Sequence, residues 1–420
     1  MTTTLSVSAH SGCPARSPGA IAHHGAGDSR AAYAHLRQEH PVYYDPDLGL
    51  WVISRHHDID EVLRDRNGAF TPAHSYDPVQ PTDPEAARIY TAVHDVPVAA
   101  STDPPVHTRY RAALTAVWPT STGQLAPWHT TVEKRALEAA LSLAARPGHT
   151  GELTADYARP LTARIMSEII GIDQADEQCV IDGSSAMADL LWSFQPPNEQ
   201  QRCSQAVVDL WNLCTTLVAQ RRDRPRDDLT TAWITYRDEQ GVPLTDAEIA
   251  STLMEVLTTN AETLALLITT ALQHLLAGDG YQRLTTHPGE APAAVEETLR
   301  QDPPLIGWLR TTTRPLTLAD THLPQGARLL LLMHSAAHDE AHAVGAPKAF
   351  DHRRTDTPPT LNFGAGIHYC PGAQYTRLVA QHALTALTRV LPGLALTTAA
   401  PGPRPVNLIL RRTVQLHVHW

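Results

Sequence analysis

The stretch Leu361–Arg377, "LNFGAGIHYCPGAQYTR", holds one cysteine between a glycine-rich run and the start of a helical pattern. Gly364 and Gly366 allow backbone shapes and close approaches that a Cβ atom would prevent. Pro371 suits the first turn of a helix, and the apolar residues after it repeat at helical spacing. We therefore expect a loop that presents Cys370 just before a helix N-terminus.

The position of Cys370 indicates a ligand chemistry. Free amides and the helix dipole favour a thiolate there. A zinc site would need three more ligands, and the local supply is only His368, so the pattern favours an iron cofactor with a single protein ligand. A buried, inert cysteine is the alternative. The chain has five cysteines without paired spacing, which argues against a disulfide framework and for a reducing compartment.

Composition narrows the class of protein. The chain has 420 residues, enough for two or three domains or for one large core, and a formal charge of −11. It shows no cluster of Lys and Arg that could follow a phosphate backbone, so we expect no nucleic acid partner. The N-terminus lacks the pattern of a signal peptide, and no stretch reaches the ~18 apolar residues of a membrane span. We expect a cytoplasmic protein that is not bound to a membrane, with residues 1–25 as a flexible tail.

Helical periodicity dominates the middle of the chain, from about residue 130 to residue 300. Strand patterns lie on both sides of it. A hairpin is predicted at 41–55, two strands at 310–318 and 327–333, and a last strand in "VQLHVHW". We expect a mainly α fold with a minor β region (α+β), formed as a single domain over 26–420 because the sheet would join both ends of the chain.

One predicted helix is unusually long. Thr245 and Glu248 form a capping box and Gly278 is a stop signal, so roughly 32 residues would span nearly 50 Å at ~1.5 Å each. Its apolar centre is interrupted by five polar residues, Thr258, Thr259, Asn260, Glu262 and Thr263. Such a cluster predicts a cavity or a kink. The alternative is that the threonines bond to their own helix and Glu262 faces solvent.

Several motifs together resemble one family. "FGAGIHYCPG" matches the signature F-G-x-G-x-H-x-C-x-G, whose fixed positions are Phe363, Gly364, Gly366, His368, Cys370 and Gly372. This is the haem-binding signature of the cytochrome P-450 superfamily. "EETLR" resembles its E-x-x-R element, "STDPPVHTRYR" the start of its C-helix, and the long central helix its I-helix. Almost the whole chain after the tail thus resembles a bacterial soluble haem-thiolate monooxygenase.

The resemblance implies haem b (iron protoporphyrin IX) between the long helix and the cysteine loop, with Cys370 as the thiolate ligand. It implies four residues that bind the haem propionates, namely His107, Arg111, Arg310 and His368. The spacing of His107 and Arg111 on one helical face suits this role, although a solvated surface would have the same spacing. Glu297 and Arg300 would form a buried structural pair with an arginine before the cysteine, either Arg353 or Arg354.

On the oxygen side of the haem, the resemblance makes Glu262 and Thr263 the acid and alcohol of a proton relay. Asn260 departs from the family, which has a glycine there, and its amide would narrow the space for oxygen. Pro371 departs as well, because proline has no N–H to donate to the ligand sulfur. We expect the Cys370 sulfur to accept one bond fewer and the haem to be harder to reduce.

The substrate pocket is expected among regions that family members vary. Its candidate residues are Trp192, Phe194, Trp211, Thr259, Leu305, Ile306 and Trp308, although most tryptophans are simply core. The resemblance implies insertion of one atom of O2 into a small organic substrate in secondary-metabolite tailoring, with electrons from ferredoxin reductase and ferredoxin. Oxidative coupling, desaturation or ring formation is the alternative that Asn260 supports. A non-catalytic haem sensor is the third hypothesis.

Overall fold

The structure is a computed structural model that describes residues 30–94, 97–342, 349–354, 359–397, 407–411 and 415–420. The expected tail, residues 1–25, lies outside the described residues. The helices are α2 Arg30–Glu39, α3 His56–Leu63, α4 Pro84–His94, α5 Val106–Val117, α6 Thr122–Ala144, α7 Arg159–Ile170, α8 Glu177–Trp192, α9 Pro197–Asp223, α10 Leu229–Thr235, α11 Asp246–Ala277, α12 Gly280–Thr286, α13 Ala291–Gln301, α14 Met333–Ala337 and α15 Ala373–Val390. The strands are β1 Val42–Asp45, β2 Leu50–Ile53, β3 Phe70–Thr71, β4 Thr150–Glu152, β5 Trp308–Thr312, β6 Leu316–Leu318, β7 Thr321–Leu323, β8 Arg328–Leu331, β9 Ala395–Leu396 and β10 His417–His419.

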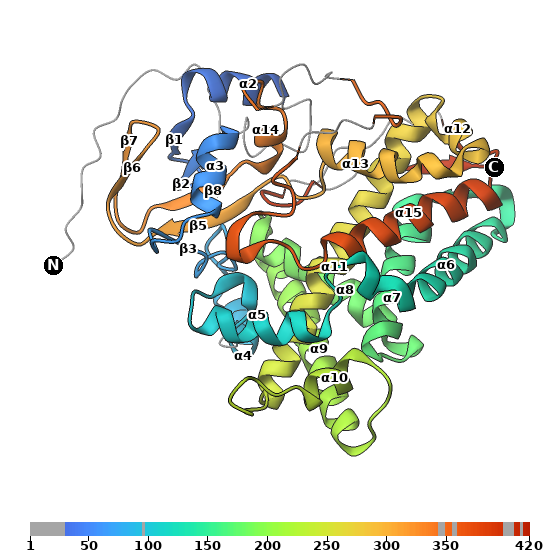
Figure 1. Cartoon of the computed structure of the whole chain (residues 1–420), viewed down its shortest axis with the longest axis horizontal. Helices are drawn as coiled ribbons and strands as arrows, with labels where there is room; N and C mark the ends of the chain where they lie inside the picture. The colour runs from blue at the N-terminus through green and yellow to red at the C-terminus, as the bar shows by residue number, and fades with distance from the viewer. Residues whose placement is uncertain (1–29, 95–96, 343–348, 355–358, 398–406, 412–414) are drawn as a thin grey trace.

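Strands from distant parts of the chain share sheets, as the sequence predicts. The larger sheet has the order β1-β2-β8-β5-β3, with β1 and β2 as an antiparallel hairpin and β8 parallel to β2. The final strand β10 pairs with both β4 and β9. Figure 1 shows the larger sheet on the left and most of the helices on the right. The predicted fold class, mainly α with a minor β region, is confirmed.

The strand predicted at 310–318 is wrong as a single element. The chain leaves β5 after Thr312 and re-forms as β6, which pairs with β7 in a separate two-stranded sheet. Pro315 lies in the break and has no N–H to continue a ladder. Ala319 and Asp320 turn the chain with positive φ angles of 45° and 63°. At the far end β8 stops at Leu331, and the residues that follow begin α14.

The long helix α11 runs through the middle of the molecule (Figure 1). Thr245 accepts a bond from the Glu248 amide, and the Glu248 side chain accepts one from the Thr245 amide, so the predicted capping box is confirmed. The helix ends at Ala277, directly before Gly278. Helices α7, α8, α9 and α15 pack around it. Apolar residues are buried on all sides of α11, which is typical of a central core helix.

The long apolar helix raises the question of membrane insertion. Among the described residues, no single helix is both long and apolar enough to cross a bilayer. Helices α11 and α12 reach that length and hydropathy only together, with a 98° bend between them.

Candidate active site

The loop before α15 folds as the glycines predict. Gly364 and Gly366 have φ angles of +71° and +67°, a region that other residues rarely adopt. A Cβ atom on Gly366 would lie 2.5 Å from the carbonyl oxygen of Leu63, so only glycine fits against α3. The Cys370 amide donates to the Phe363 carbonyl at 2.8 Å and closes the loop. Cys370 is therefore held in place just before α15 by its own backbone.

The Cys370 thiol is buried but is not isolated from positive charge. Burial raises its pKa, whereas the Gly372 amide and the guanidinium groups of Arg111 and Arg377 lower it. The helix start favours the thiolate as the sequence analysis expects, and desolvation opposes it. A metal cation bound to the sulfur would shift the equilibrium between thiol and thiolate toward the thiolate. Within the described ranges, no group of three or more His, Cys, Asp or Glu residues could hold a metal ion.

A cavity extends from Cys370 to α11 and β5. It contains most of the residues singled out from the sequence, namely Arg111, Trp192, Thr259, Asn260, Thr263, Leu305, Trp308, Arg310, Phe363, Gly364, His368, Cys370, Pro371 and Gly372. The expectation of a cavity beside the polar centre of the long helix is confirmed. Cys370 and Thr263, which lie more than one hundred residues apart in the chain, share its wall.

Some predicted residues lie elsewhere. His107, Glu262, Ile306 and Gly366 are not among the residues that line this cavity. Ile306 is buried, and its backbone amide donates to the Ile409 carbonyl. Phe194 is 44% exposed, and Trp211 lines a neighbouring cavity. Aromatic composition located the region correctly, but it could not tell which side of each strand or helix faces inward.

The four basic residues predicted to bind carboxylates gather at one side of the cavity. Arg111, Arg310 and His368 line it, and the His107 ring packs on His368 with 4.3 Å between centroids. Burial, followed by the charges of Arg310, His107 and Arg111, lowers the pKa of His368 to about 3. Burial lowers the pKa of Arg310 to about 10. These side chains repel one another when charged, so the cluster favours an anion.

Unsatisfied nitrogens at this cluster support the same conclusion. The Nε2 atoms of His107 and His368 are buried without a hydrogen-bond partner. Buried polar atoms of this kind are normally paired, so they indicate a missing partner. The two carboxylates of haem would supply both the negative charge and the acceptors. The residues therefore fit haem, with Cys370 toward the iron and the basic cluster toward the carboxylates.

The threonines of α11 meet two expectations at once, because they bond to their own helix and also line the cavity. Thr258, Thr259 and Thr263 donate to the carbonyls of Met254, Glu255 and Thr259, so the alternative in which they bond to their own helix is confirmed. All three threonines nevertheless line the cavity. Their hydroxyls satisfy the helix and leave oxygen lone pairs for other donors.

Asn260 also bonds to its own helix. Its Nδ2 atom donates to the Val256 carbonyl at 2.9 Å. Its Oδ1 atom faces the start of α15, since a Cβ atom on Gly372 would lie 3.9 Å from it. The missing side chain at Gly372 thus leaves room for the amide. Asn260 reaches the cavity wall next to the cysteine loop, as its departure from the family pattern predicts.

Glu262 is neither exposed nor directed into the cavity. The alternative in which it faces solvent is wrong, because its side chain is only 3% exposed. Both of its oxygens accept bonds from Arg159 of α7, at 2.9 and 3.2 Å. Arg159 is itself 31% exposed. Sequence spacing could not reveal this partner, which lies 103 residues earlier in the chain.

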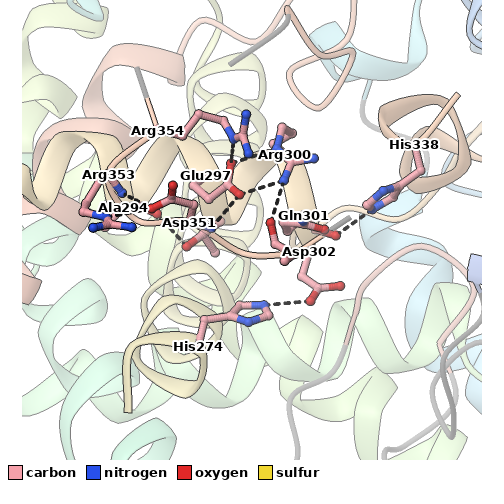
Figure 2. A network of polar contacts seen from close by, with 12 residues as sticks. His274, Ala294, Glu297, Arg300, Gln301, Asp302, His338, Asp351, Arg353 and Arg354 are labelled. Carbon is pink, nitrogen blue, oxygen red and sulfur yellow. Dashed lines mark hydrogen bonds and ion pairs between the residues drawn. The ribbon is translucent and has the colours of Figure 1, made fainter. Parts of the chain in front are cut away.

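Glu297 and Arg300 form the expected structural pair in the core (Figure 2). Their side chains are 0% and 2% exposed, and two bonds of 2.7 Å join them. The third member is Arg354, whose Nε donates to Glu297 at 3.1 Å. Arg353 points to Asp351 and is 61% exposed. The structure thus resolves a choice that the sequence left open.

Glu255 is a charged residue of the cavity that the sequence analysis did not single out. Glu255 of α11 lines the cavity one turn before Thr259 and accepts bonds from the amides of Ala99 and Ala100. The signal was available, because Glu255, Thr259 and Thr263 share one helical face at intervals of four.

Comparisons with known proteins agree with this site. Residues 291–391 match the family model described as Cytochrome P450. The chain is 30% identical over 364 residues to "Putative cytochrome P450 123" of Mycobacterium tuberculosis, covering 85% of each protein. It is 29% identical over 359 residues to "Erythromycin C-12 hydroxylase" of Saccharopolyspora erythraea, covering 82% of each. The solved structure of "cytochrome P450 CREJ in complex with (4-ethylphenyl) dihydrogen phosphate" superposes with a TM-score of 0.86 and 29% identity, covering 95% of this chain and 100% of that chain.

Proposed function

This chain belongs to the cytochrome P450 family, and we propose that it inserts one atom of O2 into a small organic substrate during bacterial secondary-metabolite tailoring. It is an oxidoreductase of the monooxygenase class, and its cofactor is haem. One observation carries the proposal. The Cys370 sulfur and the Thr263 hydroxyl line the same cavity, which aromatic and apolar side chains extend.

The chain's own residues provide a cradle for haem. Cys370 would be the thiolate ligand, and Arg111, Arg310, His107 and His368 would bind the carboxylates. When bound, haem supplies the redox chemistry that activates O2. The cationic cluster would fix the orientation of the group, because charge-assisted bonds from these donors to its carboxylates are the strong ones.

Thr263 holds a proton at the oxygen side of the cavity. Its hydroxyl donates to the Thr259 carbonyl, so its lone pairs are free to accept a bond from water or substrate. Rotation of the hydroxyl turns the same proton toward the cavity. The residue thus acts as a relay without leaving its helix.

Glu262 feeds that relay by exchanging partners. In the observed arrangement both carboxylate oxygens are engaged by Arg159, so the acid is held away from the cavity. Arg159 is partly exposed, and its movement toward solvent would free Glu262 to take up a proton. By taking up a proton from solvent and passing it on, the Glu262 carboxyl would link the Thr263 hydroxyl to bulk water.

Asn260 favours a second candidate function. Its amide occupies the cavity wall beside the cysteine loop, where it narrows the space above the haem site. A narrowed site would favour hydrogen abstraction followed by coupling, desaturation or ring formation, without oxygen insertion. The third hypothesis, a non-catalytic haem sensor, is disfavoured because Glu262 and Thr263 are both present.

The remaining parts of the proposal concern partners and location. We expect electrons to arrive from ferredoxin reductase and ferredoxin, as the resemblance to bacterial soluble haem-thiolate monooxygenases implies. A cytoplasmic location follows from the odd number of cysteines without paired spacing. A single domain over 26–420 is supported by sheets that join residues 42–53 to 308–331 and residues 150–152 to 417–419.

Product mass tests the proposal. The haem-loaded protein would be given ferredoxin, ferredoxin reductase, NADPH and labelled O2, with candidate substrates added singly. Oxygen insertion predicts a product heavier by one labelled oxygen atom. A product that is lighter by two hydrogen atoms and carries no label would replace insertion with the coupling or desaturation alternative.

A further inference from the structure

The cavity contains a charge arrangement that the proposed reaction does not use. We infer that it binds a substrate carrying a positively charged nitrogen, with Glu255 as the counter-ion and Tyr76, Trp192 and Trp308 as the aromatic walls. The inference rests on the proposed function, because it takes this cavity to be the substrate site. It names the chemical class of that substrate, which the motifs leave open.

Glu255 is a partly buried residue of α11 that lines the cavity. The Ala100 amide donates to its Oε1 atom at 2.8 Å and the Ala99 amide to its Oε2 atom at 3.2 Å. A carboxylate offers about four acceptor positions, so two amides leave capacity for a further donor. Amides also stabilise the negative charge without cancelling it. The two amides therefore hold the carboxylate in position and leave it able to accept from a cationic donor.

Among the described residues, none supplies a cation that completes this pair. Over the part of the chain that the structure describes, no Lys, Arg or His lies within ion-pair distance of Glu255. Arg111 is attracted to Glu255, but its guanidinium donates to the Tyr369 carbonyl and belongs to the cluster that binds haem carboxylates. Desolvation accordingly raises the pKa of Glu255. A buried carboxylate in this state gains most from a cationic ligand.

Three aromatic rings stand in the wall of the same cavity. The ring centroids of Trp192 and Trp308 are 5.6 Å apart, those of Tyr76 and Trp192 5.8 Å, and those of Tyr76 and Trp308 6.2 Å. Their planes are inclined by 51° to 85°, so each pair meets at an angle instead of stacking in parallel. Rings arranged in this way around a pocket are the environment that binds ammonium groups through cation–π contacts.

Tyr76 connects the rings to the carboxylate. Its hydroxyl is buried without a hydrogen-bond partner. Burial, and after it the negative charge of Glu255, raises the pKa of Tyr76. Both residues also line the neighbouring cavity, so they stand at the boundary between the two spaces. A substrate ammonium placed there would meet the carboxylate, the free phenol oxygen and the ring faces together.

A purely structural role for Glu255 makes a different prediction. In that case the carboxylate only anchors the Ala99 and Ala100 backbone, and the cavity has no preference for charge. Comparing two ligands of equal shape and different charge distinguishes a counter-ion role of Glu255 from a purely structural one. Phenethyltrimethylammonium and its uncharged isostere, in which a quaternary carbon replaces the nitrogen, provide that comparison. The quaternary nitrogen has no lone pair and cannot coordinate the haem iron.

The experiment is isothermal titration calorimetry of the haem-loaded protein with both probes. We expect wild type to bind the cation about tenfold or more tightly than the isostere. Glu255→Gln should lower that preference about tenfold, whereas Asp246→Asn, which removes an exposed charge from the first turn of the same helix, should leave it within about threefold. Equal affinity for both probes in wild type, or an unchanged preference in Glu255→Gln, would overturn the inference.

The two proposals can fail separately. A cation preference in a haem-loaded protein that oxidises no substrate would remove the proposed function and leave the inference standing. Turnover of neutral substrates together with rejection of the cation would remove the inference and leave the function. Because the wild-type comparison needs no variant, a failure of Glu255→Gln to fold would not hide the result.

Discussion

Replacing Arg354 with Gln is expected to destabilise the protein far more than the same replacement of its neighbour Arg353. Arg354 donates to Glu297, and the two side chains are 8% and 0% exposed. Arg353 contacts Asp351, with exposures of 61% and 41%. The two variants remove the same charge from adjacent residues. They differ in burial, because Arg354 and its partner are buried whereas Arg353 and its partner are exposed.

The magnitude follows from these contacts. In Arg354→Gln, Glu297 keeps Arg300 and the Asp351 amide, so its charge stays compensated, and the lost bond between Arg354 and Glu297 contributes about 1.5–3 kcal/mol. In Arg353→Gln an exposed pair is lost, which contributes less than about 1 kcal/mol. Glu297→Gln would leave two buried guanidinium groups opposite a neutral amide and should cost about 3–5 kcal/mol.

The assay is urea unfolding of the haem-loaded variants, followed by circular dichroism, with free energies from the linear dependence on urea. The reasoning predicts the order Glu297→Gln, Arg354→Gln, Arg353→Gln from most to least destabilised. If Arg353→Gln is destabilised as much as Arg354→Gln, the assignment of Arg354 as the third member of the buried network is refuted.

Three further predictions address the site. Thr263→Ala should lower product formed per NADPH consumed about tenfold or more, because the relay hydroxyl is lost; unchanged coupling measured by product and NADPH assays would exclude that role. Pro371→Leu should raise the ferric/ferrous potential in a redox titration, since the new N–H can bond to the Cys370 sulfur, and a potential that stays or falls contradicts this. Gly366→Ala should unfold at lower urea than Gly364→Ala: both have positive φ, worth about 1–3 kcal/mol, but only Gly366 also lacks space for a Cβ atom. Equal midpoints would show that the close approach to α3 is not limiting.

Sequence signals that act within a few residues, such as helix caps and glycines, predicted the long helix and the cysteine loop. The bounds of α11 followed from Thr245, Glu248 and Gly278, because a capping box and a glycine stop act within one turn. The cysteine loop followed from glycines that need positive φ. The prediction of one strand at 310–318 was wrong because it followed β propensity alone. Pro315 interrupts the hydrogen-bond ladder there.

Long-range partners could not be read from the sequence. Nothing near Glu262 indicates Arg159, and nothing in "HRRTD" distinguishes Arg354 from Arg353, because burial of each arginine is decided by helices elsewhere in the fold. The helical face that Glu255 shares with Thr259 and Thr263 is visible in the sequence, but its Ala100 amide donor lies 155 residues away and is not. Site residues within a motif could therefore be predicted from the sequence. The charged partners that lie far away in the chain could be identified only from the structure.

The carbon monoxide spectrum of the reduced, haem-loaded protein tests the central claim most directly. The account predicts the absorption band diagnostic of a thiolate-ligated haem in wild type and in Cys179→Ser, which changes a half-buried cysteine of α8. It predicts loss of that band in Cys370→Ser. A wild-type spectrum without the band, or a Cys370→Ser spectrum that retains it, would contradict ligation of the haem iron by Cys370.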